Sequence, residues 1–173
     1  MPGIDIRPTA DRLRETLFNV LTAGDPEALA GSTWADLYAG TGAVGIEAMS
    51  RGAGKVFFVE SARPAAKLIQ DNLASLQITR GFELVNGEVR KVLRRWQEQN
   101  LVLDYFYLDP PYRLENEYHD TLDFLSESTL VTNGSIVIAE HKKKFEPDVA
   151  VGVLQRYRKL VQGDAALSFY RQA

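Results

Sequence analysis

The sequence predicts an α/β protein with a doubly wound, mostly parallel seven-stranded sheet and a C-terminal antiparallel hairpin. Short apolar runs that suit buried strands alternate with amphipathic segments of helical period. Of the 173 residues, 45% are hydrophobic and 25% are charged, as in an ordinary globular chain. We therefore expect one domain over residues 1–173, with one core that helices cover on both faces of the sheet.

The first element is expected to be helical and lies within an N-terminal segment, residues 1–31. Thr9 can act as the N-cap of a helix whose apolar stripe ends at Leu21. The segment is also locally basic, through Arg7, Arg12 and Arg14. Glycine and proline then mark a loop that leads to the first strand.

The stretch 34–52 contains the first candidate site. A predicted strand over 34–38 leads into a Gly-x-Gly-x-x-Gly turn, formed by Gly40, Gly42 and Gly45, and a helix follows. Residues without a Cβ let the backbone approach a ligand, and the start of a helix presents amide donors to it. The pattern fits a nucleotide-cofactor site, and a tight turn without a ligand would use the same glycines.

Two carboxylates extend this candidate site. Asp36 lies four residues before Gly40, and Glu60 ends the next predicted strand, about 20 residues beyond the turn. An acceptor at that position can bind both hydroxyls of a ribose. NAD, FAD and S-adenosylmethionine fit this pattern equally.

The later elements continue the alternation. Helices are expected over 62–76, 89–97 and 115–126, and strands over 55–60, 82–85, 101–108 and 135–140. The tail alternates as a closing hairpin around Gly163 and Asp164. Ligands of such sheets bind beyond the carboxyl ends of the strands, and that rim contains Asp36, Glu60, Glu88 and Asp109.

The tetrapeptide Asp109-Pro110-Pro111-Tyr112 follows the strand over 101–108. Two prolines stiffen the backbone and remove two amide donors, so the Asp109 carboxylate and the Pro110 carbonyl present acceptors together. Such a pair suits an exocyclic amino group, and Tyr112 adds an aromatic face on which a planar base can stack. A rigid loop whose aspartate caps its own backbone would use the same residues.

Composition restricts the chemistry. The chain has no cysteine, which excludes disulfides, thiolate metal sites and a cysteine nucleophile. His119 and His141 are too few and too far apart for a metal site, so we expect none. No apolar run approaches the ~20 residues of a membrane span, and we expect a cytoplasmic protein. With a net charge of -3, any nucleic acid would have to bind a local basic patch.

The glycine-rich turn, Glu60 and Asp109-Pro110-Pro111-Tyr112 resemble the class I S-adenosylmethionine-dependent methyltransferases that modify exocyclic amines. Three further segments, 7–19, 36–48 and 50–53, are similar to the RsmD family, bacterial enzymes that methylate N2 of a guanine in 16S ribosomal RNA. The resemblance covers nearly the whole chain. It implies a Rossmann-like fold, S-adenosylmethionine as cofactor, and 16S RNA as partner, within the small ribosomal subunit or an assembly intermediate.

The resulting site expectations fall into three groups. The catalytic residues are Asp109, Pro110 and Tyr112. The cofactor-binding residues are Asp36, Tyr38, Gly40, Thr41, Gly42, Glu60, Ser61, Glu88 and Asp109. The RNA-binding residues are Arg7, Arg12 and Arg14, with possible help from Lys142, Lys143 and Lys144.

Two other hypotheses stay open. One is a DNA or protein amine methyltransferase, although 173 residues leave no room for a separate target-recognition domain. The other is a catalytically silent RNA-binding factor in ribosome assembly, against which the intact Asp109 and Glu60 argue. Relatives usually begin with a basic β-hairpin; six residues precede Arg7 here, so we expect that hairpin to be absent. Separately, we expect a monomer.

Overall fold

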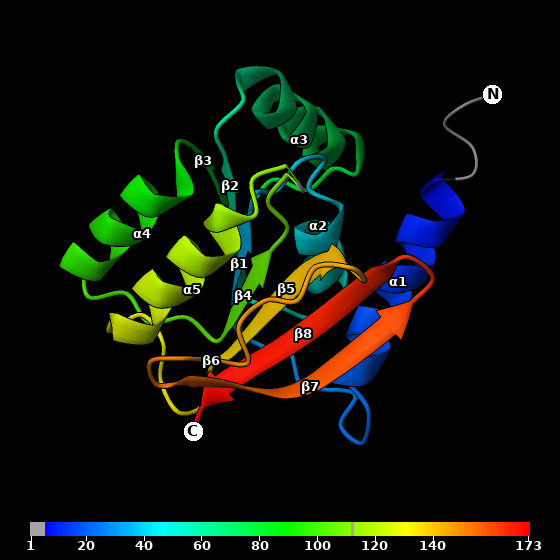
Figure 1. Cartoon of the computed structure of the whole chain (residues 1–173). Helices are drawn as coiled ribbons and strands as arrows, with labels where there is room; N and C mark the ends of the chain where they lie inside the picture. Colours follow the sequence, from blue (N-terminus) through cyan, green and yellow to red (C-terminus); the bar gives the residue numbers. More distant parts are fainter. Residues whose placement is uncertain (1–5, 112) are drawn as a thin grey trace.

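The computed structural model describes the backbone of residues 6–111 and 113–173, and side chains from residue 10 onward except residue 112 (Figure 1). A single sheet carries every strand in these ranges. The strands are β1 (Thr33–Leu37), β2 (Lys55–Glu60), β3 (Phe82–Asn86), β4 (Tyr105–Leu108), β5 (Ile136–Lys142), β6 (Ala150–Val151), β7 (Leu154–Gln162) and β8 (Ala165–Gln172). The helices are α1 (Ile6–Leu21), α2 (Ala43–Ser50), α3 (Arg63–Ser75), α4 (Val89–Glu98) and α5 (Asn116–Glu127).

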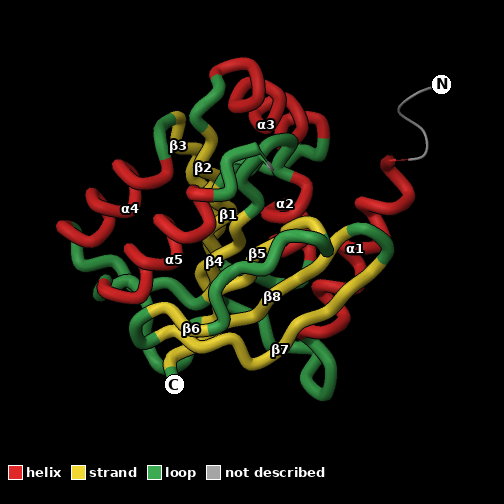
Figure 2. Tube along the Cα trace, in the orientation of Figure 1, coloured by secondary structure: helices red, strands yellow, loops and turns green. Residues whose placement is uncertain are grey.

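The strand order is β3-β2-β1-β4-β5-β8-β7-β6. β1 to β5 are mutually parallel, and β8, β7 and β6 continue the sheet in antiparallel fashion (Figure 2). The predicted α/β class, with a C-terminal antiparallel hairpin, is confirmed. The eighth strand, β6, was not predicted, because a two-residue strand has too few positions to show alternation.

The order of the strands reverses at the centre of the sheet. From β1 the chain moves outward to β2 and β3, and it then returns to the other side of β1 to form β4 and β5. Leu37 and Leu108, near the ends of β1 and β4, are paired in register. In open α/β sheets such a reversal creates a crevice beyond the carboxyl ends of the two central strands.

Helices cover both faces of the parallel part of the sheet (Figures 1 and 2). On one face, α1, α2 and α3 pack over a cluster in which the fully buried Trp34 stacks against Phe18 and Tyr105, with ring centroids 5.3 and 5.2 Å apart. On the other face, α4 and α5 cover a second cluster that contains Phe57 and Trp96, 4.9 Å apart. The two buried layers hold the strand ends rigidly in place.

Two predicted boundaries were wrong. The first helix begins at Ile6, so Thr9 lies inside it and is not its N-cap; a proline at position 8 is tolerated because the first amides of a helix have no intrahelical acceptor. The fourth strand begins at Tyr105, not at residue 101. Before it, Leu103 donates its N–H to Leu130 outside the sheet. No helix in the described ranges is both long and apolar enough to cross a bilayer.

Candidate active site

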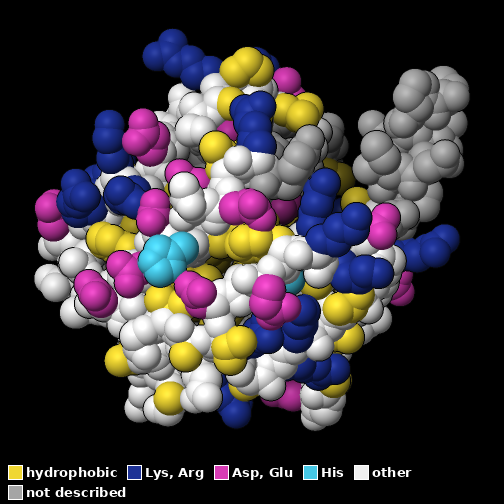
Figure 3. Space-filling model, viewed as in Figure 1, with side chains coloured by type: hydrophobic (Ala, Val, Ile, Leu, Met, Phe, Trp, Pro, Cys, Tyr) yellow, Lys and Arg dark blue, Asp and Glu magenta, His cyan; other side chains and the backbone are white. Residues whose placement is uncertain are grey.

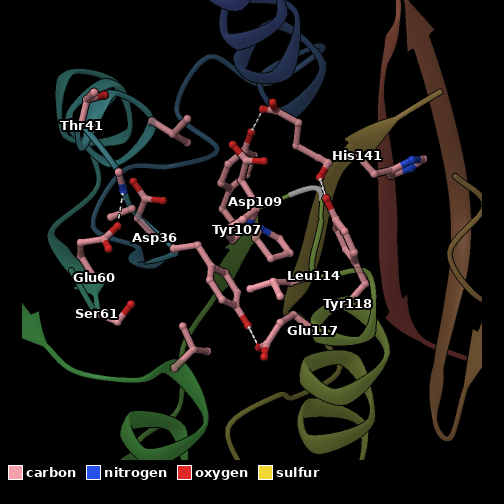
Figure 4. Close-up of a pocket in the computed structure, with 18 of the residues that line it drawn as sticks. Asp36, Thr41, Glu60, Ser61, Tyr107, Asp109, Leu114, Glu117, Tyr118 and His141 are labelled. Carbon is pink, nitrogen blue, oxygen red and sulfur yellow. Dashed lines mark hydrogen bonds between the residues drawn. The ribbon is translucent and has the colours of Figure 1, made fainter. Parts of the chain in front are cut away.

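A cavity of about 880 Å³ lies beyond the carboxyl ends of β1, β2, β4 and β5 (Figure 4). It occupies the crevice expected from the reversal of strand order. Seven acidic and three basic side chains of the described residues line it: Asp36, Glu60, Glu88, Asp109, Glu117, Asp120 and Glu140, with Arg14, Arg90 and Lys142. This excess of acidic groups favours a cationic ligand over an anionic one.

The fold brings most of the predicted site residues to this cavity. Those that line it are Asp36, Tyr38, Gly40, Thr41, Glu60, Ser61, Glu88, Asp109 and Pro110. Gly42 is buried and does not line the cavity, although its sequence neighbours Thr41 and Ala43 do. Tyr112 lies outside the described residues, as does the side chain of Arg7. The glycine turn and the Asp109-Pro110 segment thus share one cavity, although about seventy residues separate them.

Asp36 holds the glycine turn in place through a hydrogen bond. Its side chain is buried, and Oδ2 accepts the N–H of Gly45 at 2.9 Å. Burial raises the pKa of Asp36 to about 8, against the opposing effect of the Gly45 hydrogen bond, and the charges of Glu140 and Glu60 raise it further. Burial therefore favours the protonated form of Asp36.

Glu60 also holds the glycine turn in place through hydrogen bonds. Its Oε1 accepts the N–H of Gly40 at 2.8 Å, and its Oε2 accepts the N–H of Ala62 at 2.9 Å. A carboxylate has about four acceptor positions, so Glu60 can still accept hydrogen bonds from ribose hydroxyls. The assignment of Glu60 to the ribose stays a prediction. In the structure, Glu60 also fixes the conformation of the glycine turn.

The glycines of the turn are required for two different physical reasons. Gly42 has φ +81°, in the left-handed region that disfavours other residues. Gly45 has an ordinary φ, but a Cβ there would lie 2.4 Å from Cε1 of Phe58 on β2. Gly45 thus allows α2 to pack directly on the sheet, as the third glycine of such a motif does in dinucleotide-binding proteins.

The remaining cofactor candidates differ in how firmly they are held. The hydroxyl of Tyr38 donates to Oε2 of Glu117 on α5 at 2.8 Å and lies 2.8 Å from the hydroxyl of Thr121. Ser61 is exposed at the rim. Glu88 is exposed at the N-cap of α4, where it makes no side-chain capping bond. Tyr38 therefore links β1 to α5, whereas Ser61 and Glu88 are open to a ligand.

Asp109 faces the cavity with other carboxylates around it. Its pKa is raised well above the ordinary range, first by burial and then by the negative charges of Glu140 and Asp36. Although the residue as a whole is exposed to the cavity, protein atoms surround the carboxylate on most sides. Pro110, next to it, is buried. That this pair presents two acceptors, the Asp109 carboxylate and the Pro110 carbonyl, stays a prediction.

Sequence reasoning missed Glu140, on β5. Its side chain lines the cavity, and its carboxylate accepts a hydrogen bond from the hydroxyl of Tyr107 on β4. Burial raises the pKa of Glu140, while this hydrogen bond lowers it. The signal was available, because Glu140 ends a predicted parallel strand just as Glu60 does, and the carboxyl ends of parallel strands meet at one rim.

The histidines occupy two unrelated positions. His119 is exposed, and its Nδ1 lies 2.9 Å from Asp148. His141 is buried, with Nδ1 2.9 Å from the carbonyl of Lys142 and Nε2 2.8 Å from the hydroxyl of Ser168. Burial lowers the pKa of His141, so it is a neutral part of the wall. Residues 10–111 and 113–173 contain no group of three potential metal ligands.

Of the predicted RNA-binding residues, Arg12 and Arg14 have described side chains. Arg12 is exposed. Arg14 is half-buried and lines the cavity, where it contacts Asp11 at 3.2 Å and Glu47 at 3.7 Å. Figure 3 shows lysine and arginine side chains interspersed with acidic ones on the face of the molecule that it draws. Arg14 is thus partly neutralised by its acidic neighbours.

Comparison with known proteins gives consistent matches over the whole chain. Residues 1–171 match the family model described as Conserved hypothetical protein 95. Ribosomal RNA small subunit methyltransferase D of Escherichia coli K12 is 26% identical over 171 residues, which are 99% of this chain and 81% of that protein. The protein of the same name from Haemophilus influenzae is 32% identical over 139 residues, 80% of this chain and 69% of that protein.

The fold is also found among solved structures. A conserved hypothetical protein of Streptococcus pyogenes superimposes with a TM-score of 0.80 at 27% sequence identity. The superposition covers 92% of this chain and 95% of the other. The similarity therefore extends over both the parallel core and the antiparallel extension of the sheet.

Proposed function

This chain belongs to the RsmD family of class I S-adenosylmethionine-dependent methyltransferases, and we propose that it methylates the exocyclic N2 amine of a guanine in 16S ribosomal RNA. The observation that supports the proposal most directly is that Glu60 and Asp109 line the same cavity. Glu60 closes the glycine turn on one side of it, and Asp109 with Pro110 presents acceptors on the other. A methyl donor and an amine can therefore meet within one cavity.

The cavity fits S-adenosylmethionine by the chemistry of its lining. The cofactor supplies an electrophilic methyl group on a positively charged sulfur, and seven acidic side chains line the cavity. The pyrophosphate of NAD or FAD would face the same carboxylates unfavourably. Glu60 is assigned to the ribose hydroxyls, and the backbone at Gly40 and Gly42 to the closest approach of the chain. Ser61, Thr41 and Glu88 complete the cofactor side.

The amine side of the cavity is assigned to Asp109 and Pro110. The N2 amine of guanine is a poor nucleophile, because its lone pair is delocalised into the ring. Two acceptors that bind its hydrogens orient the nitrogen and favour the geometry of the transition state. The amine must also lose a proton when it is methylated, and an ionised Asp109 carboxylate beside the amine can accept it.

The position of the site in a cavity restricts the RNA structures that can be methylated. A base within a regular helix cannot reach a recessed cavity, so the target guanine must be unstacked, as in a loop or a junction. Four exposed basic groups, Arg12 on α1 and Lys142 to Lys144 at and after the end of β5, are assigned to the phosphates of the RNA. Because the basic patch is small, we expect a folded small subunit or an assembly intermediate to be a better substrate than protein-free RNA. Such a particle can add contacts through its shape and its proteins.

The test is methyl transfer from radiolabelled S-adenosylmethionine to three substrates. These are small ribosomal subunits from cells that lack the endogenous modification, the protein-free 16S RNA from the same subunits, and duplex DNA of similar length. The proposal expects incorporation into the ribosomal substrates and none into DNA. Incorporation into DNA or into the subunit proteins would favour another amine methyltransferase. Cofactor binding without transfer to any of them would favour an assembly factor.

A further inference from the structure

Glu140 is a carboxylate of the cavity to which the proposed mechanism gives no task. Its neighbour Ala139 on β5 pairs in register with Leu108 on β4. Asp109 and Glu140 are therefore successive residues on adjacent parallel strands, whose backbones lie about 4.8 Å apart. Both side chains line the same cavity. The two carboxylates thus form a pair, and each carries acceptor oxygens into the space assigned to the amine.

Glu140 is held firmly on both its side chain and its backbone. The hydroxyl of Tyr107 donates to Oε1, and burial keeps that phenol protonated by raising its pKa well above the ordinary range. The hydroxyl of Tyr118 donates to the main-chain oxygen of Glu140 at 2.6 Å (Figure 4). Within the part of the chain that the structure describes, Tyr107 is the one donor to the carboxylate. A carboxylate has about four acceptor positions, so Glu140 can accept a further hydrogen bond from a ligand.

Guanine presents two donors side by side on its Watson–Crick edge, the exocyclic N2 amine and the ring N1–H. The proposed function places the N2 amine against Asp109 and the Pro110 carbonyl. The N1–H then needs a second acceptor directly beside the first, because a buried donor without a partner costs more than the hydrogen bond is worth. We propose that Glu140 accepts the N1–H of the target guanine and so selects guanine over bases that lack this hydrogen.

The inference rests on the proposed function, and it makes a separate prediction about which bases the enzyme accepts. The base 2-aminopurine keeps the amino group at position 2 but has a lone pair at N1 and no hydrogen there. With this base, the N1 lone pair would face the Glu140 carboxylate, acceptor against acceptor. Sites built to hydrogen-bond a particular substrate group reject analogues that lack it more strongly than apolar pockets reject small changes of size.

The experiment compares guanine with 2-aminopurine at the methylated position. That nucleotide is first located in the product RNA and then replaced by ligation of synthetic RNA before reconstitution of the small subunit. The readout is kcat/KM for methyl transfer, measured with the wild type and with Glu140→Gln. The amide of Gln can accept from N1–H through its oxygen or donate to a bare N1 through its nitrogen. Glu127→Gln, exposed at the end of α5, is the matched control.

We expect the wild type and Glu127→Gln to prefer guanine at least tenfold, because hydrogen bonds to charged groups are among the strong ones. In Glu140→Gln the preference should fall to about threefold or less. Tyr107→Phe, which removes the donor that orients Glu140, should reduce it in the same direction. Equal use of the two bases by the wild type, or a preference unchanged in Glu140→Gln, would overturn the inference while guanine methylation still stands. Absence of wild-type methylation on guanine would overturn the proposed function and this inference with it.

Discussion

The carboxylate of Glu60 accepts the backbone N–H of Gly40 at 2.8 Å across twenty residues of sequence. This bond ties the end of β2 to the turn that follows β1, and the second oxygen of Glu60 holds the N–H of Ala62 before α3. The residue expected to bind the ribose therefore also fixes the backbone that lies under the cofactor. Ligand contact and local structure are coupled through one side chain.

Replacement of Glu60 by Ala should consequently have two effects. S-adenosylmethionine binding should weaken by about 1 to 3 kcal/mol, because charge-assisted hydrogen bonds to the ribose are lost. The free energy of unfolding without cofactor should fall by about 1 kcal/mol, because the amides of Gly40 and Ala62 lose their acceptor. Titration calorimetry and urea denaturation measure the two effects. Glu83→Ala, exposed on β3, is the control, and unchanged cofactor affinity in Glu60→Ala would refute the ribose assignment.

Asp36 should make the apo protein less stable as the pH rises. Its pKa is about 8 in the folded protein, because of burial, and about 4 in an unfolded chain. Between these values the folded state holds a proton that the unfolded state has released, so the free energy of unfolding falls with increasing pH. Asp36→Asn keeps an acceptor for Gly45 and cannot ionise. Relative to the wild type, it should gain up to about 4 kcal/mol between pH 5 and pH 8. Urea denaturation at both pH values tests this, and a constant difference would contradict it.

Gly45 should tolerate no side chain. An alanine Cβ would lie 2.4 Å from the ring of Phe58, and the helix α2 or the ring would have to move. Gly45→Ala should reduce the free energy of unfolding by about 1 to 3 kcal/mol through overpacking. Gly134→Ala is the control, because a Cβ there has no neighbour within 4 Å. Thermal denaturation of both variants should separate them clearly; equal melting temperatures would show that the turn adapts.

The parts of the fold that could be predicted are those that depend on local sequence patterns. The strand over 55–60 was placed correctly because its apolar run is bounded by turn residues, and Glu60, Asp36 and Asp109 reached one rim because parallel strands end together. Contacts between distant residues could not be read in this way. The bond from Glu60 to Gly40 and the one from Tyr107 to Glu140 depend on strand register, which the sequence does not state.

The RNA surface should depend on Arg12 more than on the net charge of the protein. Arg12 is exposed on α1, the helix whose Ala10 and Arg14 line the cavity, so Arg12→Glu should weaken RNA binding and reduce the salt slope by about one unit or more. Arg80→Glu, exposed just before the amino end of β3, is the matched charge reversal, because the cavity lies at the carboxyl ends of the strands. Methylation of small subunits and of protein-free 16S RNA across a salt series measures the effect. We expect subunits to be the better substrate, and equal slopes for the two variants would exclude this surface.

The most direct test of the account is the identity of the methylated nucleoside. Undermodified small subunits are treated with S-adenosylmethionine and either the wild type or Asp109→Ala, and the digested 16S RNA is analysed by mass spectrometry. The wild type should produce N2-methylguanosine. Asp109→Ala should produce almost none, while its cofactor affinity, measured by calorimetry, stays within about threefold, because Asp109 is assigned to the amine. A different methylated nucleoside, or N2-methylguanosine at a near-normal rate from Asp109→Ala, would contradict the mechanism.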